Sequence, residues 1–98
     1  MATIWGAGYS KSYVDFTRDG GAISCATNAA GSVYFKYSAG GVTWPADASA
    51  VLVGALGSSS KACHCHQKYG NGKSQIIVTN GIDKMWRSDD YGKAWSAI

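Results

Sequence analysis

The sequence predicts an all-β protein built from two copies of one small unit. Short runs of β-favouring residues alternate with Gly, Ser, Asn and Asp, and no window shows the sustained apolar spacing of an amphipathic helix. Glycine occurs 13 times in 98 residues, which disfavours helix almost everywhere. Segments of the first half recur in the second at spacings of 50 to 52 residues, so the chain divides into repeats at approximately 1–48 and 49–98.

Each repeat contains four short strands separated by turn residues. In the first repeat the strands are expected at 12–17, 22–26, 33–37 and 42–44. In the second repeat they are expected at 62–68, 74–79, 84–88 and 94–98. The breaks include Asp19-Gly20-Gly21 and Asn80-Gly81, where positive φ is cheap. Four consecutive antiparallel strands form a meander, which is the unit of a propeller blade.

The second repeat ends in a turn segment, residues 88–95, with a weaker counterpart 51 residues upstream. Ser88 and Asp90 can hydrogen-bond the backbone of their own turn, and Gly92 admits a left-handed conformation. Trp95 can close the hairpin by packing on the sheet. The upstream copy lacks the Ser and the Asp but keeps Gly41 and Trp44.

Ser88-x-Asp90-x-Gly92-x-x-Trp95 resembles the Asp-box of sialidase-type (bacterial neuraminidase, BNR) repeats, Ser/Thr-x-Asp-x-Gly-x-Thr-Trp, with Ala94 in place of Thr. The resemblance implies β-propeller blades in which the box joins the third and fourth strands. It also implies that Ser88, Asp90, Gly92 and Trp95 stabilise the blade and do not catalyse. The first repeat shares the resemblance weakly, through Gly41 and Trp44.

Two blades do not close a ring, whose usual count is 4 to 8. We therefore expect homo-oligomerisation, with three chains giving a six-bladed propeller and four chains giving an eight-bladed one as second choice. The chain is similar in design to small two-repeat lectins that trimerise into six-bladed propellers. The alternative is a monomeric sandwich in which two four-stranded sheets cover each other.

The start of the first strand and the end of the second meet at one edge of a meander, which the resemblance places opposite the Asp-boxes, on the ligand face. Lysine and asparagine at this edge offer the donors and acceptors that sugar hydroxyls require, and nearby residues offer a stacking surface or an acceptor. The candidate ligand-binding residues are Lys11, Asn28, Lys61, Asn80, Asp83, Tyr9 and Trp5. The alternative is that Thr-Asn at this edge only opens a turn.

Catalysis is not expected. The resembling sialidases use an arginine triad and a Tyr/Glu pair, whereas this chain has two arginines, Arg18 and Arg87, and no Glu. An enzyme would need copies of Arg18 or His64 to converge on a symmetry axis. The Lys and Arg residues are scattered singly and net charge is +3, so nucleic acid is not an expected partner. No apolar run approaches the ~20 residues of a membrane span, so a membrane is not expected either. No cofactor is expected.

Three cysteines cannot form a complete intrachain disulfide framework, so we expect free thiols in a reducing cytoplasm or in a virion assembled there. Cys63-His64-Cys65-His66 alternates on a strand, which puts the two residue types on opposite faces. We therefore expect packing or channel-lining residues here and no metal site.

Two functions remain. The first is a lectin, a symmetric ring whose weak glycan sites gain affinity by multivalency. The second is a structural protein of a phage virion or tail, or a decoration protein, whose ring assembly is its function and whose partners are other virion proteins.

Overall fold

The computed structural model describes residues 3–57, 62–70 and 73–98, and it is all-β apart from one 3₁₀ turn, η1, at Asp47–Ser49. Two four-stranded antiparallel sheets follow one another in the chain, each ordered as a meander. The first contains β1 (Tyr9–Phe16), β2 (Ala22–Asn28), β3 (Ser32–Ser38) and β4 (Val51–Ala55). The second contains β5 (His64–Gly70), β6 (Lys73–Thr79), β7 (Met85–Ser88) and β8 (Ser96–Ala97). The prediction of two four-stranded antiparallel sheets is confirmed.

The expected fourth strand of the first repeat is wrong. Residues 42–44 form bends and irregular backbone, and the strand that pairs with β3 is β4. Pro45 follows the expected strand and has no N–H to donate to a partner strand. The apolar run in β4 buries Val53, which is 8% exposed, whereas Val42 is 80% exposed. The first sheet therefore extends to Ala55.

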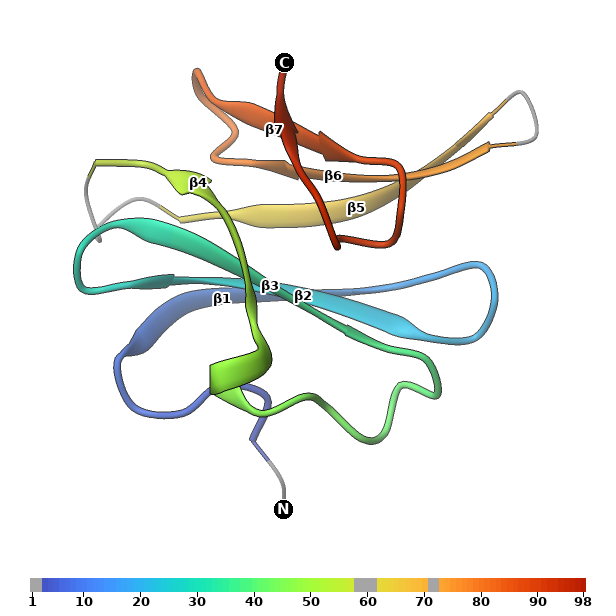
Figure 1. Ribbon diagram of the computed structural model, residues 1–98, viewed down its shortest axis with the longest axis horizontal. Coiled ribbons are helices and arrows are strands. Elements are labelled where there is room, and N and C mark those ends of the chain that lie inside the picture. Colours follow the sequence, from blue (N-terminus) through green and yellow to red (C-terminus); the bar gives the residue numbers. More distant parts are fainter. Residues whose placement is uncertain (1–2, 58–61, 71–72) are drawn as a thin grey trace.

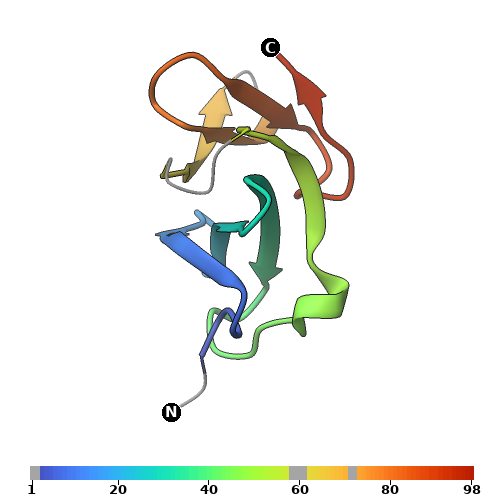
Figure 2. The same ribbon diagram turned by 90° about the vertical axis from the view of Figure 1, so that its left-hand side faces the viewer.

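The two sheets stack as layers, with the N-terminus beneath the first and the C-terminus above the second (Figures 1 and 2). The core lies between them and is one connected set of buried side chains. Its members are Ile23, Cys25, Val33, Phe35, Val53, Leu56, Cys63, Cys65, Ile76, Val78 and Trp86. Because side chains alternate along a strand, each sheet turns one apolar row toward the other.

The sheets are not evenly spaced. Their backbones approach each other mainly where β1 and β2 face β5. Towards β4 and β7, large rings fill the space. The Trp86 indole lies 2.5 Å from where a Cβ on Gly54 would stand, and the Phe35 and Trp95 ring centroids are 5.1 Å apart. The two sheets therefore form a wedge that is narrow at β1 and β5.

The far face of the first sheet is covered by the chain itself. Trp5 donates its indole N–H to the Ser24 hydroxyl at 2.8 Å. The Lys36 ammonium, buried on this face, donates to the Ile4 carbonyl and to the Asp47 carboxylate, both at 2.7 Å. Residues 3–8, called here the N-terminal arm, and the loop around η1 therefore close this face.

The far face of the second sheet has a mixed composition. The residues on this face lie 52 positions after the residues that the first sheet buries in the core, so the two rows are equivalent in the repeat. In place of Ile23, Cys25, Thr27, Val33 and Phe35 this face carries Gln75, Ile77, Thr79, Met85 and Arg87. Met85 is 42% exposed and the Arg87 side chain 45%. This face is open to solvent and only partly apolar.

Candidate functional site

The hairpin between β7 and β8 is held by its own side chains. The Ser88 hydroxyl donates to the Asp90 carboxylate at 2.7 Å and accepts the Gly92 N–H at 2.8 Å. The same carboxylate accepts the N–H groups of Lys93 and Ala94 at 3.1 and 3.0 Å. The Ser88 hydroxyl, followed by the backbone N–H of Ala94, holds the pKa of Asp90 below its usual value. These contacts provide hydrogen-bond partners for the backbone N–H groups of the turn. Ser88 and Asp90 therefore stabilise the hairpin.

Gly92 and Trp95 fix this hairpin against the other sheet. Gly92 has a φ of 90°, and a Cβ there would stand 2.1 Å from the Phe35 ring. Trp95 donates its indole N–H to the Gly92 carbonyl at 2.9 Å and packs edge-on against Phe35. The predicted roles of a left-handed glycine and a packing tryptophan match this geometry.

The upstream copy of this segment does not form a hairpin. Gly41 has a positive φ of 73°, as Gly92 does, and its N–H bonds the Ser38 carbonyl at 3.3 Å. Trp44 is half-buried and lies in irregular backbone. After Gly41 the chain continues through η1 and only then forms β4. The two segments therefore share the positive φ of their turn glycine but not the hairpin.

A second side-chain-capped turn, which sequence reasoning missed, joins β1 to β2. The Thr17 hydroxyl donates to the Asp19 carboxylate and accepts the Gly21 N–H at 2.9 Å, repeating the pattern of Ser88, Asp90 and Gly92. The signal was the spacing Thr17-x-Asp19-x-Gly21. It was overlooked because it lies outside the 51-residue repeat register and lacks a tryptophan.

Asp19 also links the two sheets. Its carboxylate accepts the hydroxyl of Tyr37 in β3 at 3.3 Å and that of Tyr91, in the β7–β8 hairpin, at 3.2 Å. The Thr17 hydroxyl first, and then Tyr91, lower the pKa of Asp19. Both capped turns therefore meet at the same end of the molecule.

The opposite end carries the candidate ligand-binding residues. Tyr9 pairs with Asn28 and Ser10 with Thr27, so the start of β1 and the end of β2 lie side by side. Lys11 is exposed and sits at a β-bulge with a φ of 54°. Lys61, its expected counterpart, lies outside the described residues.

Both candidate asparagines are engaged in turns. The Asn28 side-chain oxygen accepts the N–H groups of Ala30 and Ser32 at 3.1 and 2.9 Å. Asn80 is 6% exposed, and its side-chain oxygen accepts three successive backbone N–H groups, from residues 82 to 84, at 3.0 to 3.1 Å. The turn between the second and third strands of each sheet is capped in this way by an asparagine. The side-chain oxygen atom that a ligand would need as an acceptor is therefore already occupied.

Trp5, in the N-terminal arm, packs against Tyr9 at the start of β1. Their ring centroids are 4.8 Å apart, and Tyr9 meets Tyr34 of β3 edge-on at 5.7 Å. The Lys36 ammonium lies 4.5 Å from the Trp5 ring centroid. These rings cover the first sheet.

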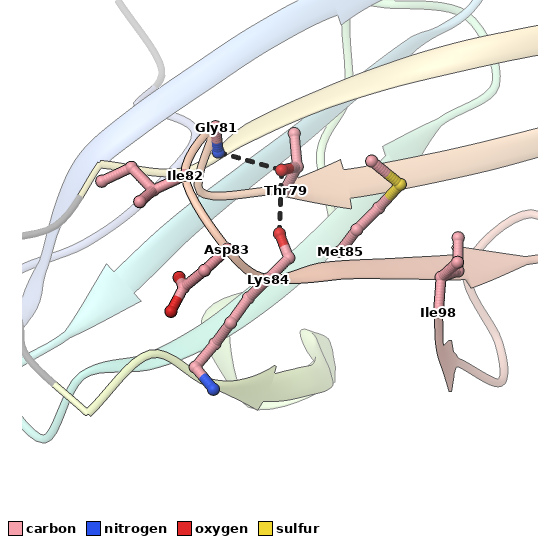
Figure 3. Close-up of a pocket in the computed structure, with 7 residues that line it drawn as sticks. All are labelled: Thr79, Gly81, Ile82, Asp83, Lys84, Met85 and Ile98. Carbon is pink, nitrogen blue, oxygen red and sulfur yellow. Dashed lines mark hydrogen bonds between the residues drawn. The ribbon is translucent and has the colours of Figure 1, made fainter.

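Asp83 lies in a concavity of about 520 Å³ beside the turn between β6 and β7 (Figure 3). Its walls come from the turn and from the end of the chain, and they are Thr79, Gly81, Ile82, Asp83, Lys84, Met85 and Ile98. The Asp83 carboxylate accepts the Asn80 side-chain N–H at 2.8 Å, which orients it. Polar groups and apolar side chains thus share one open hollow. The corresponding turn of the first sheet, residues 28–32, has Gly31 and Ser32 in place of Asp83 and Lys84.

A histidine group lies at the narrow side of the wedge. His64 and His66 stack with ring centroids 6.3 Å apart, and Tyr13 lies 4.9 and 5.2 Å from them. His66 Nδ1 is 3.2 Å from the Asp15 carboxylate. Cys63 and Cys65 point instead into the core, as strand alternation predicts. In the described ranges, no group of three or more His, Cys, Asp or Glu residues has metal-binding geometry.

The chain matches no family model, no curated protein and no solved structure. The Asp-box interpretation therefore stays a prediction that depends on four residues and their turn. Among the described residues, the one helical turn, η1, is far too short to cross a bilayer.

Proposed function

We propose that this protein binds carbohydrate without catalysis and does so as a ring of identical chains. The observation that carries the proposal is the hollow beside the β6–β7 turn, which combines Asp83 and Lys84 with the apolar side chains of Ile82, Met85 and Ile98. It lies on the edge of the sheet opposite the Ser88 hairpin, where the Asp-box resemblance places a ligand face.

The chemistry of this hollow suits a sugar. A carboxylate can accept hydrogen bonds from two neighbouring hydroxyls, and an ammonium can donate to a third oxygen. The apolar wall offers contact to the C–H face of a pyranose, with Met85 as an adaptable surface. The hollow is open and small, so a single site would bind weakly.

The equivalent turn of the first sheet has Gly31 and Ser32 in place of Asp83 and Lys84, so we count one such hollow per chain among the described residues, and affinity would come from several chains acting together. Three chains, giving six blades, remain the favoured assembly, and four the second choice. The wedge between the sheets supports this, because sheets that splay outward from a narrow side are arranged as adjacent blades are. Two exposed apolar side chains, Phe16 at the end of β1 (78%) and Met85 on the open face of the second sheet (42%), support further contacts between chains.

Native mass spectrometry combined with a glycan array tests both parts of the proposal. We expect ring-sized oligomers that bind a subset of glycans. Lys84→Ala and Asp83→Asn should each reduce glycan binding about tenfold or more without changing the oligomer. Ser32→Ala, the change at the position equivalent to Lys84 in the first sheet, is the matched control and should leave binding intact.

The second candidate is a structural ring in a phage virion or tail, or a decoration protein. This structural role is favoured because four of the seven residues proposed to contact a ligand are already engaged. Asn28 and Asn80 cap turns, and Trp5 and Tyr9 cover the first sheet. Ring-sized oligomers that ignore every glycan would favour this role over the lectin. A single-chain species at micromolar concentration would refute the ring.

We place the protein in the cytoplasm or in a virion assembled there, because its three cysteines are unpaired, and free thiols persist where the environment is reducing.

A further inference from the structure

A second hollow, of about 190 Å³, lies on the wide side of the wedge, at the end of the molecule that carries the two capped turns. One wall comes from β3 and the connection into β4, and the other comes from the β7–β8 hairpin. Its apolar lining consists of Phe35, Tyr37, Pro45, Val51 and Tyr91. It shares no residue with the hollow beside Asp83, so the two are separate places on the chain.

The aromatic rings of this hollow are held in position by the fold. The ring centroids of Tyr37 and Tyr91 are 4.9 Å apart, and both hydroxyls donate to the Asp19 carboxylate, at 3.3 and 3.2 Å. Phe35 is 1% exposed and is packed edge-on by Trp95. Side chains fixed in this way lose little conformational freedom when a ligand packs against them.

The backbone of Tyr91 indicates that its ring has a role in this hollow. Tyr91 has a φ of 58°, a left-handed conformation that glycine and asparagine adopt at lower cost. The turn is already held by Ser88 and Asp90, so the hairpin itself does not require an aromatic side chain there. A residue kept in a costly conformation often belongs to a binding site. Here that conformation places a tyrosine ring in the wall.

The charge of the hollow is positive. Lys93 lines it and is exposed, whereas the Lys36 ammonium is buried on the far face with the Asp47 carboxylate. The carboxylates of Asp19 and Asp90 accept hydrogen bonds from tyrosine hydroxyls and from the turn backbone. Among the described residues, no acidic side chain lines the hollow and none forms an ion pair with the Lys93 ammonium. A ligand that carries one negative charge would therefore complement this site.

We propose that this hollow binds a small aromatic carboxylate, with its ring against Tyr37 and Tyr91 and its carboxylate beside Lys93. The volume sets the size, because an apolar cavity of about 150 Å³ already admits benzene, so one six-membered ring with a short side chain fits here. Ring-to-ring contacts and an ammonium–carboxylate hydrogen bond are both favourable. An open site for a ligand of about ten non-hydrogen atoms should have a Kd of about 1 mM.

An NMR titration of the whole ¹⁵N-labelled chain with phenylacetate tests the proposal. We expect the backbone amide signals of Gly92 and Lys93 to shift and to saturate with a Kd of about 1 mM. Benzylamine has the same ring and the opposite charge, and it should bind about tenfold more weakly or less.

Two variants and a control separate the contributions of charge and ring. Lys93→Ala should weaken phenylacetate binding about tenfold, whereas Lys68→Ala, at an exposed lysine of β5, is the matched control and should not change it. Tyr91→Asn removes the ring but tolerates the left-handed backbone, and it should abolish saturable binding. The amide spectrum of each variant shows whether it is folded. If Tyr91→Asn does not fold, the lysine variants and benzylamine still decide.

Four results would overturn the proposal. They are no saturation at ten times the expected concentration, equal binding of phenylacetate and benzylamine, equal effects of the two lysine substitutions, and shifts confined to residues 79–84. The last result would place the ligand in the hollow proposed for carbohydrate. Neither glycan binding nor the ring enters this test, so its failure and the failure of the proposed function are distinguishable.

Discussion

Gly92→Ala tests how the β7–β8 hairpin is fixed to the first sheet. The residue has a φ of 90°, and a new Cβ would stand 2.1 and 2.4 Å from two carbons of the Phe35 ring. Phe35 is 1% exposed and packs on Trp95, so its ring has little room to retreat. The substitution therefore adds backbone strain and overpacks the core at one position.

The two costs can be estimated separately. A left-handed conformation costs a residue with a Cβ about 1–2 kcal/mol. Forcing extra carbon into a filled core costs about 1–3 kcal/mol more. The sum, about 2–5 kcal/mol, is a large part of the roughly 5–15 kcal/mol by which a domain of this size resists unfolding.

Gly20→Ala provides a matched control. Gly20 has nearly the same φ, 91°, but no atom lies within 4 Å of where its Cβ would stand. It should show the strain alone. We expect urea unfolding, followed by circular dichroism, to find Gly92→Ala less stable than Gly20→Ala by about 1–3 kcal/mol.

Equal losses of stability in the two variants would refute the packing argument. A further check uses Phe35→Leu, which removes part of the ring. If the new Cβ of Gly92→Ala collides with that ring, its added cost should shrink in the Phe35→Leu background. Additive effects of the two substitutions would show that the strain lies elsewhere.

Three further predictions concern the other polar contacts. The folded state lowers the pKa of three carboxyls, Asp19, Asp47 and Asp90. The stabilisation by these carboxylates should therefore be fully present above their ordinary pKa of 3.8 and should be lost as pH falls below about 4 through the lowered pKa values. A urea midpoint that stays unchanged down to a pH of about 2.5 would contradict this. Asn80→Ala should cost about 1–3 kcal/mol in urea unfolding, and more than Asn28→Ala, because Asn80 is buried and caps three N–H groups where Asn28 caps two; the reverse order would be unexpected. Asp47→Ala leaves the buried Lys36 ammonium without its carboxylate and should lower Tm by several degrees. Asp89→Ala removes an exposed ion pair with Arg87 and should leave Tm nearly unchanged. Equal shifts in Tm would show that the buried pair does not stabilise the fold more than the exposed one.

Local turn chemistry made the sheets predictable from the sequence. Asp19-Gly20 and Asn80-Gly81 sit at turns because their preferences depend on a few neighbouring atoms. The fourth strand of the first sheet was misplaced because its position depends on what it pairs with after a long connection. Val51–Ala55 is a strand because it pairs with β3 and buries Val53, and neither contact is visible in its own residues.

The candidate site shows a different limit. The amides of Asn28 and Asn80 suit sugar hydroxyls, but in the fold their side-chain oxygen atoms accept backbone N–H groups of their own turns. A sequence gives the donors and acceptors of a side chain and does not show which of them the fold has already used. Asp83 is a candidate that the sequence provides, but Ile98 reaches the same hollow only because the end of the chain returns along β7.

The two repeats are not interchangeable, and this constrains any ring. In the first sheet, Val33 and Phe35 face the core, whereas Met85 and Arg87 occupy the same positions on the open face of the second. A neighbouring chain would therefore meet a more polar surface than the one that the two sheets share within a chain. Contacts between chains should be weaker than contacts between sheets, because this face is less apolar and contact there would bury the Arg87–Asp89 ion pair. If the chains form a ring, dilution below micromolar concentration should separate them while each pair of sheets stays folded.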